Sequence, residues 1–320
     1  MKLILSKDEA LKLDIASIDK GYVSNNDLMK NAGMISAQYF IDKVNSPFNK
    51  KVLVLAGNGN NGGDALIMHH YLIKYGVKSH IYFFNRNHQK KIIVNYKMSM
   101  NNEIFNIDSD ILESFDWFVD GIFGIGLNRP IKGKYEKIIR LLKNKSIFSL
   151  DIPSGINPDT GYLFSDIFCK PSIVASMGYL KPGNIMNNGK QFFKNTKILD
   201  INFPKAENVI NAKSKFIIDK KDIMSILKED DFLKNKFSSF SSLIVGSREY
   251  SGAGVLSLLA TLKSGSNYVQ TLVPGKISEI YESSCYESKI IGFGNKDYFS
   301  ENNVKRVVES ISIRKGPVLI

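Results

Sequence analysis

The sequence predicts an α/β fold with a doubly wound, mostly parallel sheet. Continuous apolar runs of strand length recur through the first two thirds of the chain, as expected for strands buried on both faces. Segments with apolar residues at helical spacing lie between these runs. Clusters of Gly, Asn and Asp follow several runs, where a strand would end. This alternation is typical of a three-layer fold, in which helices cover both faces of the sheet.

The first elements form one strand–helix–strand unit. Residues 8–44 carry apolar side chains at mixed spacings of three and four, which predicts two helices separated by a turn at 21–26. The apolar run 51–57 ends in glycine and predicts a buried strand. A helix that ends at Gly76 and a strand over 78–84 complete the unit.

The same pattern repeats further along the chain. A strand is expected to begin at residue 116, followed by a helix over 135–145. The run 146–155 predicts a strand with a loop at its carboxyl end. Two more strands are expected over 171–178 and 197–204, so that the sheet has several parallel strands.

The alternation lapses after this sheet. A polar stretch at 205–214 predicts a linker, so we expect a first domain over 1–212 and a second over 213–320. The segment 241–274 has the pattern strand, glycine turn, helix, strand, which starts a second α/β unit. Because the run 314–320 reads as a strand with no helix after it, we interpret the second domain as incomplete.

The composition excludes several classes of protein. The net charge of +12 is compatible with nucleic-acid binding, but the lysines are scattered and no RNA-binding motif occurs, so no nucleic-acid partner is expected. A positive field would still attract phosphate-bearing substrates. No apolar stretch is long enough to span a bilayer, and no signal-peptide core occurs, so no membrane partner is expected. With Cys169 and Cys285 far apart, the sequence predicts a reduced, cytoplasmic protein.

Polar clusters follow three predicted strands, whose carboxyl ends would meet at one edge of the sheet. The first is GNGNNGGD (57–64), where glycines leave backbone N–H groups free at the start of a helix and can bind a phosphate. It lacks the Lys-Ser/Thr of a P-loop and differs from the dinucleotide-binding GxGxxG. The alternative is a structural turn in which Asn60 caps the helix.

Two aspartates mark the other strand ends. Asp120 precedes a GxG turn, and Arg129 adds a positive charge. Asp151 ends a hydrophobic strand, where partial desolvation suits a carboxylate to proton transfer. A loop cap or a salt-bridge partner is the alternative for each Asp alone. Together with Asn61 and Ser154, these residues supply neutral and singly charged oxygens that suit a large monovalent cation better than Mg²⁺.

Four motifs, in this order, resemble the NAD(P)H-hydrate epimerase domain, the YjeF N-terminal type. They are VLAGNGNNGGD (54–64), VDGIFGIGLNRPIKG (119–133), LDIPSGINPDTG (150–161) and MGYLKPG (177–183). The segment IDKGYVSNNDLMKNAG (18–33) is similar to the helical signature at the start of that family. The resemblance spans residues 8–204 and implies a Rossmann-like fold.

The resemblance also implies a site. Its substrate-binding residues would be Asn60, Asn61, Gly62, Gly63, Asp64, Gly124, Ile125, Gly126, Leu127, Asn128, Arg129, Pro130 and Asp151. A potassium ion would be held by Asn61, Asp120 and Ser154. Two positions depart from the family pattern, because Ala65 stands where glycine is usual and Ile125 replaces a small hydroxyl residue. Ile125 would remove one hydrogen bond to phosphate, which costs about 1 kcal/mol.

The implied activity is epimerisation of the R and S forms of the 6-hydroxy hydrate of NADH or NADPH (NADHX and NADPHX). Water would leave and re-enter at C6, with Asp151 as the acid and base, and a homo-oligomer is expected. The alternative is a non-catalytic scaffold of the same fold. That alternative predicts losses at the acidic and amide positions, whereas Asn61, Asp120, Asp151 and Ser154 are all present.

The second domain resembles the start of another family. LIVGSREYSGAGVLSLLATLKSGSNYVQTLVP (243–274) is similar to the beginning of the ADP/ATP-dependent NAD(P)H-hydrate dehydratase domain, which has a ribokinase-like fold. The later nucleotide loop and catalytic aspartate of that family have no counterpart before Ile320. We therefore expect dehydration with ADP or ATP only if a complete domain exists.

Overall fold

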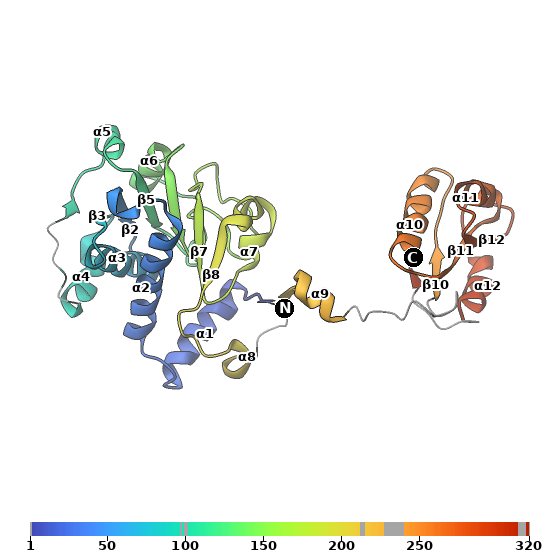
Figure 1. Ribbon diagram of the computed structural model, residues 1–320, viewed down its shortest axis with the longest axis horizontal. Helices are drawn as coiled ribbons and strands as arrows, with labels where there is room; N and C mark the ends of the chain where they lie inside the picture. Colours follow the sequence, from blue (N-terminus) through green and yellow to red (C-terminus); the bar gives the residue numbers. More distant parts are fainter. Residues whose placement is uncertain are drawn as a thin grey trace. The chain divides into compact units, whose positions relative to one another are not determined.

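A computed structural model of the protein describes residues 2–96, 98, 102–211, 215–226, 240–312 and 318–319. The chain divides into two compact units, Met1–Ile223 and Met224–Ile320 (Figure 1). The domain boundary expected between residues 212 and 213 lies outside the described residues. The assignment of domains to these segments therefore stays a prediction.

The first unit is built on a seven-stranded sheet. Its order is β4 (Glu103–Ile104), β3 (Lys78–Phe83), β2 (Lys51–Ala56), β5 (Trp117–Gly121), β6 (Ser146–Leu150), β7 (Ile173–Met177), β8 (Thr196–Leu199). Every neighbouring pair is parallel. The prediction of a doubly wound, mostly parallel sheet is confirmed.

Helices cover both faces of this sheet (Figure 1). They include α1 (Lys7–Asp19), α2 (Asn25–Lys43), α3 (Asn60–Lys74), α4 (Arg86–Asn95), α5 (Ser109–Glu113) and α6 (Lys134–Leu141). Side chains of β2 alternate between the faces, because successive strand residues point to opposite sides. Val52 and Val54 join the core cluster that contains α2 and α3, whereas Leu53 and Leu55 join the one that contains α5 and α6. Burial on both faces explains why this strand is a continuous apolar run.

Side-chain caps fix where the first two helices begin. The Ser6 hydroxyl accepts from the backbone N–H of Glu9 at 3.3 Å, and the Glu9 carboxylate accepts from the Ser6 N–H at 2.8 Å. This reciprocal capping box satisfies two backbone donors at the start of α1. The Ser24 hydroxyl caps α2 by accepting from the backbone N–H of Asp27 at 3.0 Å.

Several elements differ from the sequence expectation. The span after β3, left without an element, contains α4, β4 and α5. The expected linker contains a short helix, α8 (Ala206–Val209), whose Ala206 and Val209 pack against Leu5 and Leu13. The alternative in which Asn60 caps α3 is wrong, because the N-cap is Gly59 and makes no side-chain cap bond. The remaining elements of this unit are β1 (Lys2–Leu3), η1 (Pro47–Asn49), α7 (Pro182–Ile185), η2 (Asn187–Asn195) and β9 (Phe216–Ile217), with α9 (Lys220–Ile226) at the division.

The second unit is a further α/β segment. Its four-stranded parallel sheet has the order β12 (Ser288–Phe293), β11 (Tyr268–Pro274), β10 (Phe240–Ile244), β13 (Val318–Leu319). Its helices are α10 (Ser251–Lys263), η3 (Gly275–Ile277), α11 (Ser278–Ser284) and α12 (Glu301–Ser312). Residues 314–317 and 320 of the expected final strand lie outside the described residues. Among the helices that the structure describes, none has the length and apolar character of a bilayer span.

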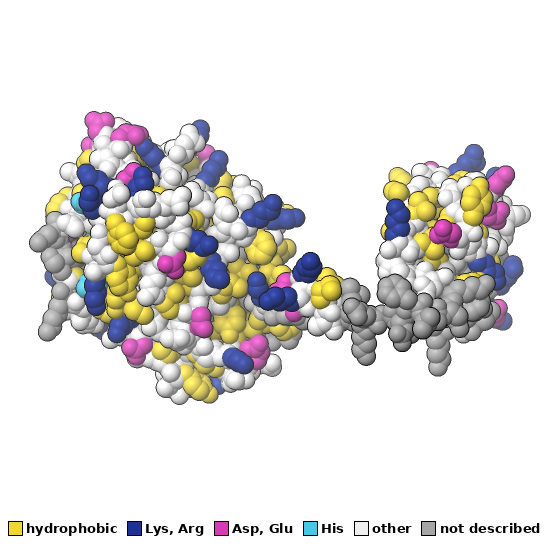
Figure 2. Space-filling view, viewed as in Figure 1, with side chains coloured by type: hydrophobic (Ala, Val, Ile, Leu, Met, Phe, Trp, Pro, Cys, Tyr) yellow, Lys and Arg dark blue, Asp and Glu magenta, His cyan; other side chains and the backbone are white. Residues whose placement is uncertain are grey.

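Basic side chains do not gather into one patch on the face of the first unit drawn in Figure 2. Lys and Arg are interspersed there with Asp, Glu and apolar side chains. This dispersion agrees with a general bias towards lysine in the composition.

Candidate functional site

A large pocket lies at the carboxyl edge of the first sheet. From β2 the chain passes through α3 to β3 on one side, and from β5 it passes through α6 to β6 on the other side. Ligands of doubly wound sheets bind at such a reversal of strand order. The pocket has a volume of about 1070 Å³, and the loops that follow β2 and β5 line it.

Two glycines let these loops pack backbone against backbone. A Cβ atom on Gly57 would lie 1.9 Å from the carbonyl oxygen of Ile122. A Cβ atom on Gly62 would lie 2.0 Å from the carbonyl oxygen of Gly57. Any larger residue at either position would force the loops apart, because real Cβ contacts are not this short.

Gln89 of α4 holds the glycine loop from behind. Its side chain is buried, and its Nε2 donates to the carbonyl oxygens of Gly57 at 2.9 Å and Gly59 at 3.3 Å. The Gly59 carbonyl also accepts from the backbone N–H of Gly63 at 3.2 Å, so Gln89 links the loop at Gly57 to the first turn of α3. Gln89 was not expected from the sequence, since nothing in the local pattern marks a residue whose side chain contacts another loop.

Asp120 is fully buried at the end of β5, below the pocket. Its carboxylate accepts from the hydroxyls of Ser149 at 2.8 Å and Ser154 at 2.6 Å, and from the backbone N–H groups of Ser154 at 2.9 Å and Ile122 at 3.3 Å. Burial raises the pKa of Asp120, and these hydrogen bonds oppose the shift. The Ser154 hydroxyl also accepts from the Phe123 N–H at 2.9 Å, so the loops after β5 and β6 are joined here.

Asn61 has a buried side chain whose amide oxygen and nitrogen have no hydrogen-bond partner. The amide lies against the loop after β5, since a Cβ atom on Gly124 would be 3.3 Å from its Cγ. An unpaired buried amide is costly, so this geometry fits a residue that awaits a ligand. Amide, hydroxyl and carboxylate oxygens of Asn61, Ser154 and Asp120 together suit a large cation of low charge.

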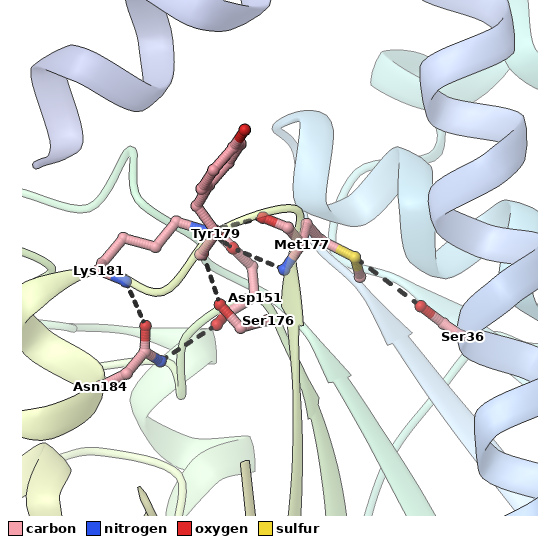
Figure 3. Close-up of polar contacts among 7 residues, drawn as sticks. All are labelled: Ser36, Asp151, Ser176, Met177, Tyr179, Lys181 and Asn184. Atoms are coloured by element: carbon pink, nitrogen blue, oxygen red, sulfur yellow. Dashed lines mark hydrogen bonds and ion pairs between the residues drawn. The ribbon is translucent and has the colours of Figure 1, made fainter. Parts of the chain in front are cut away.

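Asp151 follows β6 with a positive φ of 64°, a conformation that Asp tolerates better than most residues. Lys181, from the loop before α7, directs its Nζ to the Asp151 carboxylate and to the carbonyl oxygen of Met177, the latter at 3.2 Å (Figure 3). Asn184 accepts from the Lys181 backbone N–H at 2.8 Å and donates to the Asp151 carbonyl at 3.4 Å. The result is a buried ion pair at the wall of the pocket.

Two further carboxyl groups line the same pocket. Asp14 of α1 and Asp64 of α3 are half-buried, and neither makes a hydrogen bond or ion pair with any residue that the structure describes. Burial raises the pKa of Asp14 to about 6, with Lys181 opposing and Asp151 adding to the shift. Burial also raises the pKa of Asp64 well above its usual range, and the charges of Asp151 and Asp14 add to this.

Most of the expected substrate-binding residues lie together. Those that line the pocket are Asn60, Asn61, Asp64, Gly124, Ile125, Gly126, Leu127, Asn128, Arg129, Pro130 and Asp151. Gly62 and Gly63 are buried in α3 behind the lining. Asp120 and Ser154 lie beneath the lining and hydrogen-bond to each other. Neither Lys181 nor Asp14 could be assigned to the site from the sequence, because their relation to Asp151 depends on elements far apart in the chain.

The two positions that depart from the family pattern lie in different surroundings. Ile125 is a lining residue of the pocket, half-buried in its wall. Ala65 is fully buried, and its Cβ lies 2.2 Å from where a Cβ atom on Gly121 would be. Its methyl group therefore fills space above Gly121 rather than space for a ligand.

The family profile described as YjeF-related protein N-terminus matches residues 25–183. The NAD(P)H-hydrate epimerase of Oenococcus oeni is 32% identical over 210 residues, which cover 62% of this chain and 96% of that protein. The bifunctional NAD(P)H-hydrate repair enzyme Nnr of Dictyoglomus turgidum is 31% identical over 296 residues, which cover 89% of this chain. The chain spans 57% of the length of that bifunctional enzyme and 52% of the one from Thermofilum pendens.

A solved structure supports the fold. The crystal structure of the yeast protein ynu0 (YNL200c) matches with a TM-score of 0.50 at 22% identity, and covers 60% of this chain and 86% of that one. The matched profile covers the loops after β2, β5 and β6 that line the pocket. The chain therefore belongs to the YjeF-related N-terminal family, the family of the NAD(P)H-hydrate epimerases.

Proposed function

We propose that this chain interconverts the R and S epimers of the 6-hydroxy hydrate of NADH or NADPH. The observation that carries the proposal is the buried ion pair of Asp151 and Lys181, which lies in the wall of a pocket built by two glycine loops. The names of the relatives give the substrate class, since they are NAD(P)H-hydrate epimerases or bifunctional repair enzymes. The scaffold alternative is not favoured, because the acidic and amide positions are present.

The reaction requires proton transfer to and from the hydroxyl oxygen on one carbon, C6. C6 of the hydrate carries a hydroxyl group next to the ring nitrogen. When that hydroxyl is protonated, the nitrogen lone pair expels water, the C6–O bond breaks, and an iminium-like ring forms. Water then adds to the other face of C6 and loses a proton. Asp151 is the proposed acid and base, and Lys181 positions its carboxylate through their ion pair.

The glycine loop after β2 is proposed to hold phosphate groups of the substrate. Backbone N–H groups at the N-terminus of α3 face the pocket through residues that line it, Gly59 and Asn60. A helix N-terminus favours an anion, and the first turn of α3 carries no acidic residue to oppose it. Arg129, exposed in the pocket lining, supplies a positive charge on the other loop.

We further propose that K⁺ is held by Asn61, Asp120 and Ser154. The unpaired amide of Asn61 beside the loop of Gly124 supports this assignment. Bound K⁺ would supply positive charge next to the buried Asp120 carboxylate and so stabilise the contact between the loops after β5 and β6. The proton transfers remain with the side chains of the pocket.

The test is the rate at which the purified chain equilibrates the two epimers, in K⁺ and in Na⁺. We expect acceleration above the spontaneous rate, larger in K⁺. Asp151→Asn should reduce the rate by about 100-fold or more, as expected on loss of a general acid–base group. A wild-type chain that binds the hydrate without accelerating its epimerisation would instead support the scaffold alternative.

A further inference from the structure

Inversion at C6 needs proton transfer on two faces of one ring. Water leaves from one face and returns to the other, and one carboxylate fixed at the end of a strand serves only the face towards it. We propose that Asp14 of α1 is a second catalytic residue, which carries the proton on the face of the substrate opposite Asp151. This inference rests on the proposed function and deepens it.

The position of Asp14 supports this role. It lines the same pocket as Asp151 but comes from α1, which precedes the sheet in the chain and is not part of the strand edge. The capping box of Ser6 and Glu9 fixes the start of this helix, and the buried Leu13 and Ser17 hold it against the unit on either side of Asp14. A carboxyl group on a helix anchored in this way has a defined position in the wall.

Asp14 and Asp151 differ in their partners, as two groups with opposite roles should. Asp151 is paired with the Lys181 ammonium, whereas Asp14 has no hydrogen-bond or ion-pair partner among the described residues. The charged groups whose fields act on Asp14 come from separate elements: Lys181 before α7, Asp151 after β6, and Asp64 on α3. Because burial raises the pKa of Asp14 to about 6, it holds a proton at higher pH than an exposed Asp and can donate it.

The other titratable groups in the lining fit this role less well. Asp64 comes from α3, directly after the glycine loop proposed for phosphate, and burial raises its pKa well above the usual range, so it releases a proton less readily than Asp14. The Tyr179 hydroxyl accepts from the backbone N–H of Ala206 at 2.9 Å, and its ring points away from Lys181 in Figure 3. The ring of Tyr135 is stacked on Phe84 with centroids 4.2 Å apart. Asp14 is the remaining unpartnered carboxyl of the lining outside the glycine loop.

The proposed cycle balances without any co-reactant. Asp14 donates a proton to the hydroxyl of one epimer, the C6–O bond breaks, and water leaves on that side. Asp151 takes a proton from the water that adds to the opposite face, which forms the other epimer. In the reverse direction Asp151 donates and Asp14 accepts. Proton exchange with solvent restores both groups between turnovers.

The test follows both epimerisation and exchange of the C6 hydroxyl oxygen with ¹⁸O-labelled water. In Asp14→Asn, water can leave and return only on the Asp151 face. We expect interconversion to fall by about 100-fold or more, while one epimer alone still exchanges its oxygen. In the double variant Asp151→Asn/Lys181→Met, which leaves no acid on that face, the other epimer alone should exchange.

Asp19→Asn is the matched control, since Asp19 is exposed on the same helix and does not line the pocket. It should epimerise like wild type. Thermal unfolding and binding of NADPH establish that each variant is folded. Full interconversion by folded Asp14→Asn, or exchange of both epimers by it, would overturn the role of Asp14. A wild-type chain without acceleration would overturn the proposed function itself, and this inference with it.

Discussion

Lys181 and Asp151 form an ion pair in which the two side chains are only 4% and 12% exposed. They come from separate loops at the carboxyl edge of the sheet, after β7 and β6. Because the pair is buried, removal of one partner destabilises the fold more than removal of both, since it leaves the other charge unpaired away from water. The same two side chains therefore affect both the stability of the fold at this edge of the sheet and the proton transfer proposed for the pocket.

Single and double variants should separate stability from activity. Asp151→Asn or Lys181→Met alone leaves one buried charge unpaired, and we expect a loss of about 3 kcal/mol in the free energy of unfolding. The double variant should recover most of that loss, because no unpaired charge remains, yet it should not recover epimerisation. Urea unfolding and the epimerisation rate measure the two effects.

Lys50 and Asp116 provide a surface pair for comparison, with a distance of 3.1 Å and exposed side-chain fractions of 38% and 40%. Lys50→Met should cost less than about 1 kcal/mol, as is usual for exposed pairs. Equal losses for the surface and the buried pair would contradict the importance given to burial.

Asn61→Leu should remove the response to K⁺. In wild type, K⁺ at about ten times its Kd should stabilise the folded chain by about 1.4 kcal/mol relative to Na⁺. Without K⁺, the variant should be as stable as wild type or more stable by about 1 kcal/mol, because Leu replaces a buried amide that has no partner. Thermal unfolding in both salts gives the comparison, and an unchanged K⁺ shift in the variant would remove Asn61 from the proposed ion site.

Gln89→Leu should affect binding more than turnover. The variant loses the donor that holds the carbonyls of Gly57 and Gly59, so the loop proposed for phosphate loses its fixed position. We expect KM to rise by about tenfold, which corresponds to about 1.4 kcal/mol, with a smaller change in kcat. Gln191→Leu is the control, since Gln191 lies in η2 and its side chain donates, among the residues that the structure describes, to the nearby Asn188 carbonyl alone. A fall in kcat at constant KM would argue against a positioning role for Gln89.

His69 should make the fold sensitive to acid. It is buried, its Nδ1 lies 2.8 Å from the Ser79 hydroxyl, and burial lowers its pKa from 6.5 to about 3. The unfolded chain then binds a proton that the folded chain does not, so stability is full above pH 6.5 and falls as the pH falls towards 3. His69 should account for a loss of about 2 kcal/mol in the free energy of unfolding between pH 7 and pH 5.

His69→Gln should flatten this part of the stability profile, and exposed His88→Gln should leave it unchanged. Unfolding by urea at several pH values measures both slopes. Equal slopes for wild type and His69→Gln would show that another group causes the acid sensitivity.

Asp14 should give the opposite pH dependence of stability from His69. Its pKa is raised from 3.8 to about 6, so the folded chain holds the proton more tightly and loses stability as the pH rises through 6. Asp14→Asn cannot ionise and should unfold a few degrees higher than wild type at pH 8, with a smaller difference at pH 5. Asp19→Asn should show no such dependence on pH, and a stability gain for Asp14→Asn that is the same at both values would contradict this account.

The sequence determined the central strands of the first unit, the helices α1, α2, α3 and α6, and the edge where its polar residues meet. The run at 51–57 could be identified as a buried strand because both of its faces are apolar, and the Val52 and Leu53 faces indeed join different cores. The parallel strands bring their carboxyl ends to one edge, so Asn61, in the first turn of α3, and Asp151, after β6, line one pocket. Short polar elements such as α4 and β4 were missed, because their local pattern is too weak to separate them from a loop.

Only the tertiary structure decided how the side chains of the site are paired. Lys181 carries no local signal of its role, since its partner Asp151 comes from a loop on the other side of β7. Asp14 lines the pocket because α1, near the start of the sequence, packs against α8, which comes near the end of the first unit's sequence. The sequence shows that Asn61 is polar, but it does not show that the amide is buried and has no hydrogen-bond partner among the described residues. Residue type and spacing specify local structure, whereas burial and pairing depend on which distant elements the fold brings together.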